Sequence, residues 1–208
     1  MPEANGLLMA FMEPPAEMGD EFNDWYDMEH LPERVAIPGF LSGTRWVCLH
    51  GYPRWVATYF LTKPAVLHEP AYEKVGGNNA SPWTKRVTAR TIGRLRVVGE
   101  RIGVGETPIT AETTARLLVA RYPVASGAAE TALVRAIEDV AAGLAERPAV
   151  RLFRGIEAPA GEPGSGVWLL AGFARPVGAE TMMPALGLVG GVGATHFNLY
   201  MPHWKTLG

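Results

Sequence analysis

The stretch EFNDWYDMEHLPERVAIPGFLSGTRW, residues 21–46, contains the signals that decide the fold. Pro32 disfavours helical backbone at the residue before it, so the pattern predicts a helix over residues 17–31. Four side chains of this helix lie at i, i+3, i+4 and i+7 and share one face: Phe22, Trp25, Tyr26 and Glu29. A Pro-Gly pair at residues 38–39 then predicts a turn, and the strand-forming residues 40–50 follow it.

The elements on either side of this stretch complete a β-α-β-β-α-β order. An apolar run at residues 6–12 is stopped by two prolines, which favours a buried strand over a helix. Residues 40–50 and 54–61 flank a Gly-Tyr-Pro turn and are predicted to pair as a hairpin. The unit ends with a second helix in two pieces and a further strand, at residues 64–75, 82–92 and 95–102.

The same order of elements recurs in the second half of the chain. Its predicted elements are four strands at 115–122, 150–156, 167–174 and 195–201 and two helices at 128–146 and 178–188. Residues 103–113 have the composition of a linker, so we divide the chain into residues 1–105 and 106–208. Each half has the pattern of a ferredoxin-like unit, whose helices cover one face of a four-stranded antiparallel sheet. Because the other face of each sheet also needs cover, we predict an α+β barrel built from two tandem ferredoxin-like units.

Composition narrows the class of protein. The chain has 208 residues, of which 48% are hydrophobic and 19% charged, and its net charge of -2 offers no basic excess for binding nucleic acid. The single cysteine, Cys48, cannot form an internal disulfide or hold an iron-sulfur cluster, and no set of ligands has zinc spacing, so we expect no metal site. Without a signal-peptide core or an unbroken apolar span, we expect a cytosolic protein that does not enter membranes.

The stretch at residues 21–46 resembles the EthD-like branch of the dimeric α+β barrel proteins. In that branch a Trp/Tyr-x-x-x-His-x-Pro motif leads through Pro-Gly-Phe to a strand that carries an arginine. The matching positions here are Tyr26, His30, Pro32, Pro38-Gly39-Phe40 and Arg45. The resemblance covers residues 5–102, whereas the second half agrees in element order alone and lacks the motif. The chain therefore resembles a single-chain duplication in which one copy has lost the motif.

This resemblance implies a range of functions on one scaffold. Similar barrels include polyketide cyclases, lactone isomerases, cofactor-free monooxygenases acting on phenols, and proteins without an assigned activity. The first interpretation is an enzyme that uses acid/base chemistry on a small aromatic, polyketide-like or lactone compound, with no cofactor. The alternatives are a non-catalytic binding or accessory protein, or a barrel that is only a packed core. A homodimer is compatible with the resemblance, and haem stays open because some related barrels bind it.

His30 is the candidate catalytic residue. Tyr26 lies four residues before it and Asp27 three, within side-chain reach on a helix. Asp27 and the negative helix end would both favour the imidazolium form, and such a histidine can act as a general acid or base. The alternative is a histidine that only satisfies free carbonyls at the helix end.

Aromatic and carboxylate side chains of the first half are the candidates for a ligand pocket. They are Trp25, Tyr26, Glu29, Tyr59 and Trp83. The alternative for each aromatic residue is ordinary core packing. For Glu29 the alternative is a structural ion pair with Arg34 or Arg45, because buried charges are usually paired.

A second polar cluster is predicted on the last strand. His196, Asn198 and Tyr200 alternate at period two and therefore share one face of that strand. If this face lines the barrel, the three residues form a second site, and Phe197 and Leu199 face the helices. The alternative is an outward polar face of an edge strand.

Overall fold

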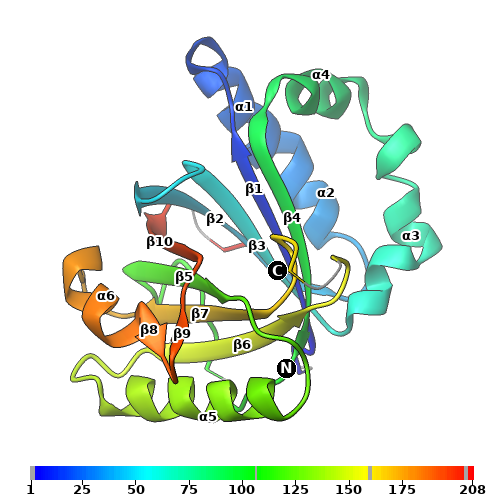
Figure 1. Cartoon of the computed structure of the whole chain (residues 1–208). Coiled ribbons are helices and arrows are strands. Elements are labelled where there is room, and N and C mark those ends of the chain that lie inside the picture. Colours follow the sequence, from blue (N-terminus) through cyan, green and yellow to red (C-terminus); the bar gives the residue numbers. More distant parts are fainter. Residues whose placement is uncertain (1–2, 106, 159–160, 204–205) are drawn as a thin grey trace.

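The structure, a computed structural model, describes residues 3–105, 107–158, 161–203 and 206–208. Eight strands form one closed barrel in the order β1-β3-β2-β10-β5-β7-β6-β4, and every neighbouring pair is antiparallel (Figure 1). The barrel strands are β1 (Gly6–Glu13), β2 (Phe40–His50), β3 (Trp55–Leu61), β4 (Ile92–Arg101), β5 (Arg116–Tyr122), β6 (Ala149–Gly155), β7 (Val167–Phe173) and β10 (His196–Pro202). The α+β barrel predicted from the element order is therefore confirmed.

Each half of the chain supplies one continuous run of four strands to this barrel. The halves meet at two seams, where β2 pairs with β10 and β4 pairs with β6. Helices lie on the outside, those of the first half against β1 to β4 and those of the second half against β5 to β7 (Figure 1). The helices are α1 (Gly19–Trp25), α2 (Leu31–Val35), α3 (Pro70–Glu73), α4 (Pro82–Arg90), α5 (Ala128–Gly143) and α6 (Ala179–Leu186).

The two-residue periodicity of the strands separates three apolar layers. In β3, Tyr59 packs under the helices of the first half, while its neighbour Phe60 faces the interior of the barrel. In β6, Leu152 packs under the helices of the second half and Phe153 faces the interior. The interior holds large side chains from both halves, among them Phe11, Trp46, Leu117, Phe153, Trp168 and Tyr200. Because both sheets contribute side chains to this one interior, the two halves of the chain pack against each other.

The first helix is longer than predicted. The helical backbone does not stop before Pro32, because a π-helical turn at Tyr26–His30 connects α1 to α2. At this turn the Leu31 N–H bonds to the carbonyl of Tyr26, five residues earlier. The wider turn places Pro32 in the first turn of α2, where a missing N–H is tolerated. The predicted end at residue 31 was therefore wrong, and His30 lies inside a helical segment rather than at its end.

Two further segments bear on the predicted elements. The glycine-rich residues between α6 and β10 form a small hairpin of β8 (Leu188–Val189) and β9 (Val192–Gly193). The broken second helix is confirmed, since a 3-10 turn at Pro64–His68 and α3 precede α4. Among the described residues, no helix combines the length and the apolar character needed to cross a bilayer.

The interior packing predicts a large difference between two leucines. Leu117 is completely buried inside the barrel, whereas Leu188 is 64% exposed. We expect Leu117→Ala to lower the free energy of unfolding by about 2 to 5 kcal/mol, because it leaves a cavity in a closed interior. Leu188→Ala is the matched control and should change it by less than about 0.5 kcal/mol. Urea unfolding of both variants measures this, and equal costs would contradict a packed interior.

Candidate functional site

The motif side chains of the first half gather between the π-helical turn and the outer face of the sheet. The rings of Trp25 and Tyr26 lie 4.8 Å apart between centroids, and the ring of His30 lies 4.4 Å from Trp25 and 5.2 Å from Tyr26. Tyr59 reaches the same layer from β3. The structure thus brings together four of the six predicted site residues: Trp25, Tyr26, His30 and Tyr59.

Three polar atoms in this cluster are buried without a hydrogen-bond partner. They are the hydroxyls of Tyr26 and Tyr59 and Nδ1 of His30. The two hydroxyls are close enough to influence each other's pKa, although neither makes a well-formed hydrogen bond. Each such group costs about 1 to 3 kcal/mol, and native proteins rarely retain several in one place. We call Tyr26, His30 and Tyr59 the orphan cluster.

The surroundings of the orphan cluster keep its groups uncharged. Burial, together with the positive charges of Arg34 and Arg45, holds the pKa of His30 well below its ordinary value. Burial raises the pKa of Tyr26 and raises that of Tyr59 still further. At neutral pH the cluster therefore consists of a neutral imidazole and two protonated phenols. The expectation that Asp27 would favour the imidazolium form of His30 was wrong.

Asp27 instead neutralises Arg45, which is buried beneath the helix. The guanidinium of Arg45 is 1% exposed and donates to Oδ1 of Asp27 at 2.5 Å and to the side-chain oxygen of Asn23 at 2.8 Å. It also lies over the rings of Tyr26 and Trp55, at 4.5 and 4.9 Å. Burial alone would raise the pKa of the Asp27 carboxyl, but the nearby imidazole of His203 and the guanidinium of Arg45 lower it.

His203 lies next to this ion pair and comes from the other half of the chain. Its Nε2 lies 3.7 Å from Oδ2 of Asp27, and its ring meets that of Trp55 edge-on at 4.7 Å. Sequence reasoning missed this contact because His203 follows the last strand, far from Asp27 along the chain. The sequence contains no local signal for it, since only the closure of the barrel brings the two residues together.

Glu29 and Trp83 occupy a neighbouring network rather than the orphan cluster. Glu29 accepts hydrogen bonds from Ser81 at 2.5 Å and Thr84 at 3.3 Å, and Thr84 in turn accepts one from the indole of Trp25 at 3.0 Å. The expected ion pair with Arg34 or Arg45 does not form, because Arg34 pairs with Glu33 and Arg45 with Asp27. Trp83 donates to Glu21 at 3.2 Å. The hydrogen bonds of this network link α4 to the first helix.

The polar cluster on the last strand lines the interior of the barrel, and Phe197 and Leu199 face the helices. Asn198 donates to the hydroxyl of Tyr200 at 2.7 Å and to the carbonyl of Tyr52 at 2.9 Å. The ring of His196 lies 5.0 Å from Phe11 and 5.4 Å from Trp168, and its Nε2 has no partner. Burial and the charge of Arg121 lower the pKa of His196 to about 4.

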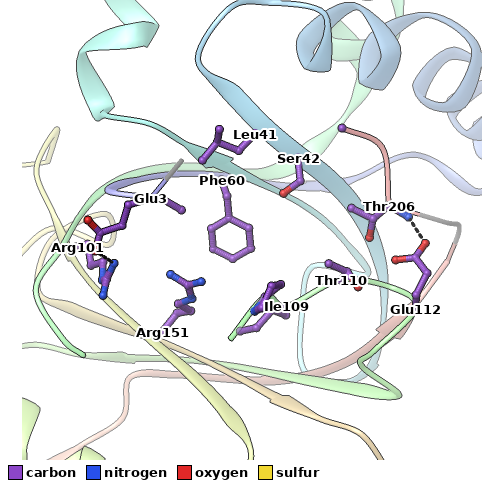
Figure 2. Close-up of a pocket in the computed structure, with 13 residues that line it drawn as sticks. Glu3, Leu41, Ser42, Phe60, Arg101, Ile109, Thr110, Glu112, Arg151 and Thr206 are labelled. Carbon is purple, nitrogen blue, oxygen red and sulfur yellow. Dashed lines mark hydrogen bonds and ion pairs between the residues drawn. The ribbon is translucent and has the colours of Figure 1, made fainter. Parts of the chain in front are cut away.

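A cavity of about 710 Å³ lies at one mouth of the barrel, away from both clusters. Figure 2 shows Phe60, Ile109 and Arg151 at its centre and Glu112 at its rim. None of the predicted site residues lines it. Within the described part of the chain, no three His, Cys, Asp or Glu side chains are grouped so that they could hold a metal ion.

Comparisons with known proteins agree with the fold. No protein-family model matches the chain, and no curated protein matches its sequence. An anthrone oxidase-like protein superposes with a TM-score of 0.66 at 16% identity, over 97% of this chain and 92% of its own. A chlorite dismutase variant from Candidatus Nitrospira defluvii superposes with a TM-score of 0.60 at 10% identity, over 98% of this chain and 93% of its own. A heme-binding protein from Thermus thermophilus superposes with a TM-score of 0.57 at 10% identity, over 96% of this chain and 91% of its own.

These likenesses show that the chain shares the α+β barrel fold of these proteins. At such low identity they show the fold alone, so the EthD-like branch and the duplication stay predictions.

The neutral state of His30 predicts how stability depends on pH. Its pKa in the folded protein is lower than in the unfolded chain, so the unfolded chain takes up the proton first as the pH falls below about 6.5. Stability should therefore decrease from about pH 6.5 downwards. In His30→Gln this decrease should be smaller by up to about 2 kcal/mol at about pH 5.

Urea unfolding across this pH range measures the difference. The matched control is His50→Gln, which removes an exposed imidazole that lies outside the orphan cluster. An unchanged slope in His30→Gln would mean that the imidazole is not held neutral.

Proposed function

We propose that this protein is a small-molecule enzyme that removes a proton from an aromatic, polyketide-like or lactone compound. His30 is the general base, and the hydroxyls of Tyr26 and Tyr59 bind the oxygen of the substrate. The observation that carries this proposal is the orphan cluster, because the ring of Tyr26 lies beside that of His30 and its hydroxyl lies near that of Tyr59, while none of the three groups has a well-formed hydrogen bond. A substrate that carries an acidic proton next to an oxygen would satisfy all three groups.

The electrostatics of the cluster suits a reaction that forms an anion. The neutral imidazole is in its proton-accepting form at neutral pH, as a general base must be. The positive charges of Arg34 and Arg45, which disfavour protonation of His30, would favour negative charge on a substrate oxygen. Protonated phenols can donate hydrogen bonds to that oxygen and stabilise the developing charge.

The proposed step is an enolisation. Nδ1 of His30 takes the proton from a carbon that lies next to a carbonyl or is conjugated with it through an aromatic ring, as in anthrone, and the electron pair of the broken C–H bond moves directly or through that ring to the carbonyl oxygen. The products are an imidazolium and an enolate, which the two tyrosine hydroxyls hold. Enolates and phenolates of this kind are the intermediates through which cyclisation, isomerisation and reaction with oxygen proceed. The site therefore supports this common first step without selecting among the three outcomes.

A substrate would reach the cluster past His30, and the rings of Trp25 and Tyr26 that pack against His30 must move apart to admit it. Tyr26 and Tyr59 are buried, whereas His30 is partly exposed. The π-helical turn forms this wall, and π turns inserted in helices are frequent at functional sites. The likeness to an anthrone oxidase-like protein supports a flat aromatic ketone as the first compound to test.

Haem does not fit the residues present in this conformation. The heme-binding protein among the similar structures raises the question. His30 and His196 each have a ring nitrogen without a partner, but aromatic rings pack within 4.4 Å of His30 and 5.0 Å of His196. Neither histidine lines the cavity at the barrel mouth, where a planar macrocycle would have room. We therefore derive no step through haem.

Proton exchange tests the proposal directly. In deuterated water, the protein should accelerate the exchange of the methylene protons of anthrone or a related ketone, measured by NMR. His30→Ala should lower this rate by about 10² to 10⁴, the usual loss of a general base, and Tyr59→Phe by about tenfold or more. His68→Ala is the control that should leave the rate unchanged.

A thermal-shift screen of phenols, lactones and anthrones should precede the assay, because a bound compound raises the melting temperature by mass action. If a compound stabilises the wild type but not the Tyr59→Phe variant, and no proton exchanges, the site only binds. That result would overturn the enzymatic proposal and favour the alternative of a binding protein.

A further inference from the structure

An aromatic pair, Phe40 and Tyr72, adjoins the orphan cluster. The ring of Phe40 meets the ring of Tyr59 edge-on, with 5.7 Å between centroids and 75° between planes. The ring of Tyr72 is stacked on that of Phe40, with 6.0 Å between centroids and 13° between planes. Burial is the largest cause of the raised pKa of Tyr26 and Tyr59, and the nearby Tyr72 contributes to both shifts. Two parallel rings therefore lie beside the tyrosine hydroxyls of the cluster.

The two rings of this pair stand on elements that differ in burial. Phe40 is the first residue of β2 and is buried, so the sheet fixes its position. Tyr72 belongs to α3, and every residue of α3 and of the 3-10 turn at Gly77–Asn79 is partly or fully exposed. Figure 1 shows α3 at the periphery of the molecule. We call residues 69–79 the outer segment. Because it removes little apolar surface from water, moving it outward costs little free energy.

The outer segment is anchored at both ends. Before it, the side chains of Val66 and Leu67 are buried in the core of the first half. After it, the hydroxyl of Ser81 caps α4 and donates to Glu29 at 2.5 Å. Within it, none of the described residues comes within 4 Å of the position that a Cβ on Gly77 would take, so the backbone there has room to rotate. The outer segment can therefore swing outward while β3 and α4 stay in place.

Arg34 holds the outer segment in its present position. Its guanidinium donates to the carbonyl of Val75 at 2.9 Å and lies 5.2 Å from the centroid of the Tyr72 ring. It also pairs with Glu33 at 3.3 Å, so it keeps a counter-charge when the outer segment moves. Because an arginine side chain has several rotatable bonds, it can follow the Val75 carbonyl over a short distance while Tyr72 separates from Phe40.

We propose that Phe40 and Tyr72 form a slot for the flat body of the substrate, which lies between the two rings and next to Tyr59. This inference rests on the proposed function, because the oxygen of the same compound would bind the tyrosine hydroxyls. Stacked rings are about 3.5 Å apart, so the outer segment moves outward by about that much to admit one ring system. Both faces of a planar ligand are then covered, whereas a saturated body needs a wider gap. The slot selects planar aromatic compounds over saturated lactones.

Binding of 2-naphthol and of its saturated analogue decahydro-2-naphthol tests the slot. Calorimetry should give 2-naphthol an affinity at least about tenfold higher, because only the planar compound gains two stacked faces. Nuclear Overhauser contacts should connect the protons of 2-naphthol to the rings of both Phe40 and Tyr72. Equal affinities for the two compounds would overturn the proposal, as would the absence of 2-naphthol binding or of contacts with Tyr72.

Variants of Tyr72 test the slot from the protein side. Tyr72→Leu should weaken 2-naphthol binding by about three- to tenfold, because the ligand loses one stacked face, and should leave decahydro-2-naphthol binding unchanged. Tyr72→Phe keeps the ring and should bind like the wild type. Tyr52→Leu is the matched control, because Tyr52 is exposed in the turn between β2 and β3. Undiminished 2-naphthol binding to Tyr72→Leu would overturn the proposal, and the contacts in the wild-type complex decide if that variant does not fold.

The outcome is distinguishable from that of the proposed function. If 2-naphthol binds between the two rings but the protons of anthrone do not exchange, the slot is supported and the enzymatic proposal is overturned. If anthrone protons exchange and Tyr72→Leu changes neither that rate nor 2-naphthol binding, the slot is overturned and the proposed function stands. Proton exchange that His30→Ala reduces, together with 2-naphthol contacts to both rings, is the result expected if both proposals hold.

Discussion

The guanidinium of Arg45 is almost completely removed from water, and a cation in that position needs a counter-charge close by. Asp27 supplies it from the first helix, and Asn23 and the rings of Tyr26 and Trp55 complete the surroundings. The helix must therefore lie where its carboxylate meets the arginine of β2. That placement positions Tyr26 beside His30 and near the hydroxyl of Tyr59, and it puts Asp27 within reach of His203. Both the helix-sheet contact and the site depend on this ion pair.

Much of the fold could be predicted because its signals are local. Alternation along the strands, the breaks at proline and glycine, and the repeated order of elements are all read within short windows, and together they predict the barrel. The helix end predicted from Pro32 was wrong. The rule that a proline ends a helix applies to α-helical backbone, whereas this chain inserts a π-helical turn before Pro32. Nothing in the spacing of residues 21–46 distinguishes the two.

The site was predictable only in part, because only its local features can be read from the sequence. Helical spacing brings Tyr26 and His30 together, and strand alternation places His196, Asn198 and Tyr200 inside the barrel. The charge state of His30 was not predictable, because its pKa is lowered first by burial and then by the charges of Arg34 and Arg45, and the nearby Asp27 does not offset them. The hydroxyl partners of Glu29 belong to α4, and the cavity at the mouth is assembled from both halves and their linker. To predict such features, one must know the order of the strands in the barrel and not only which residues form each strand.

The pairing of β2 with β10 also determines when the barrel can close during synthesis of the chain. The nascent first half emerges with β2 and β4 as open edges, because their partners β10 and β6 come later in the chain. Its inner face, with Leu7, Trp46 and Val97, has no cover until the second sheet has been translated. Open edges and exposed apolar faces are the features through which incomplete chains aggregate. The barrel closes only when the segment His196–Pro202 pairs with β2, and this pairing therefore ends the interval in which the newborn chain is vulnerable.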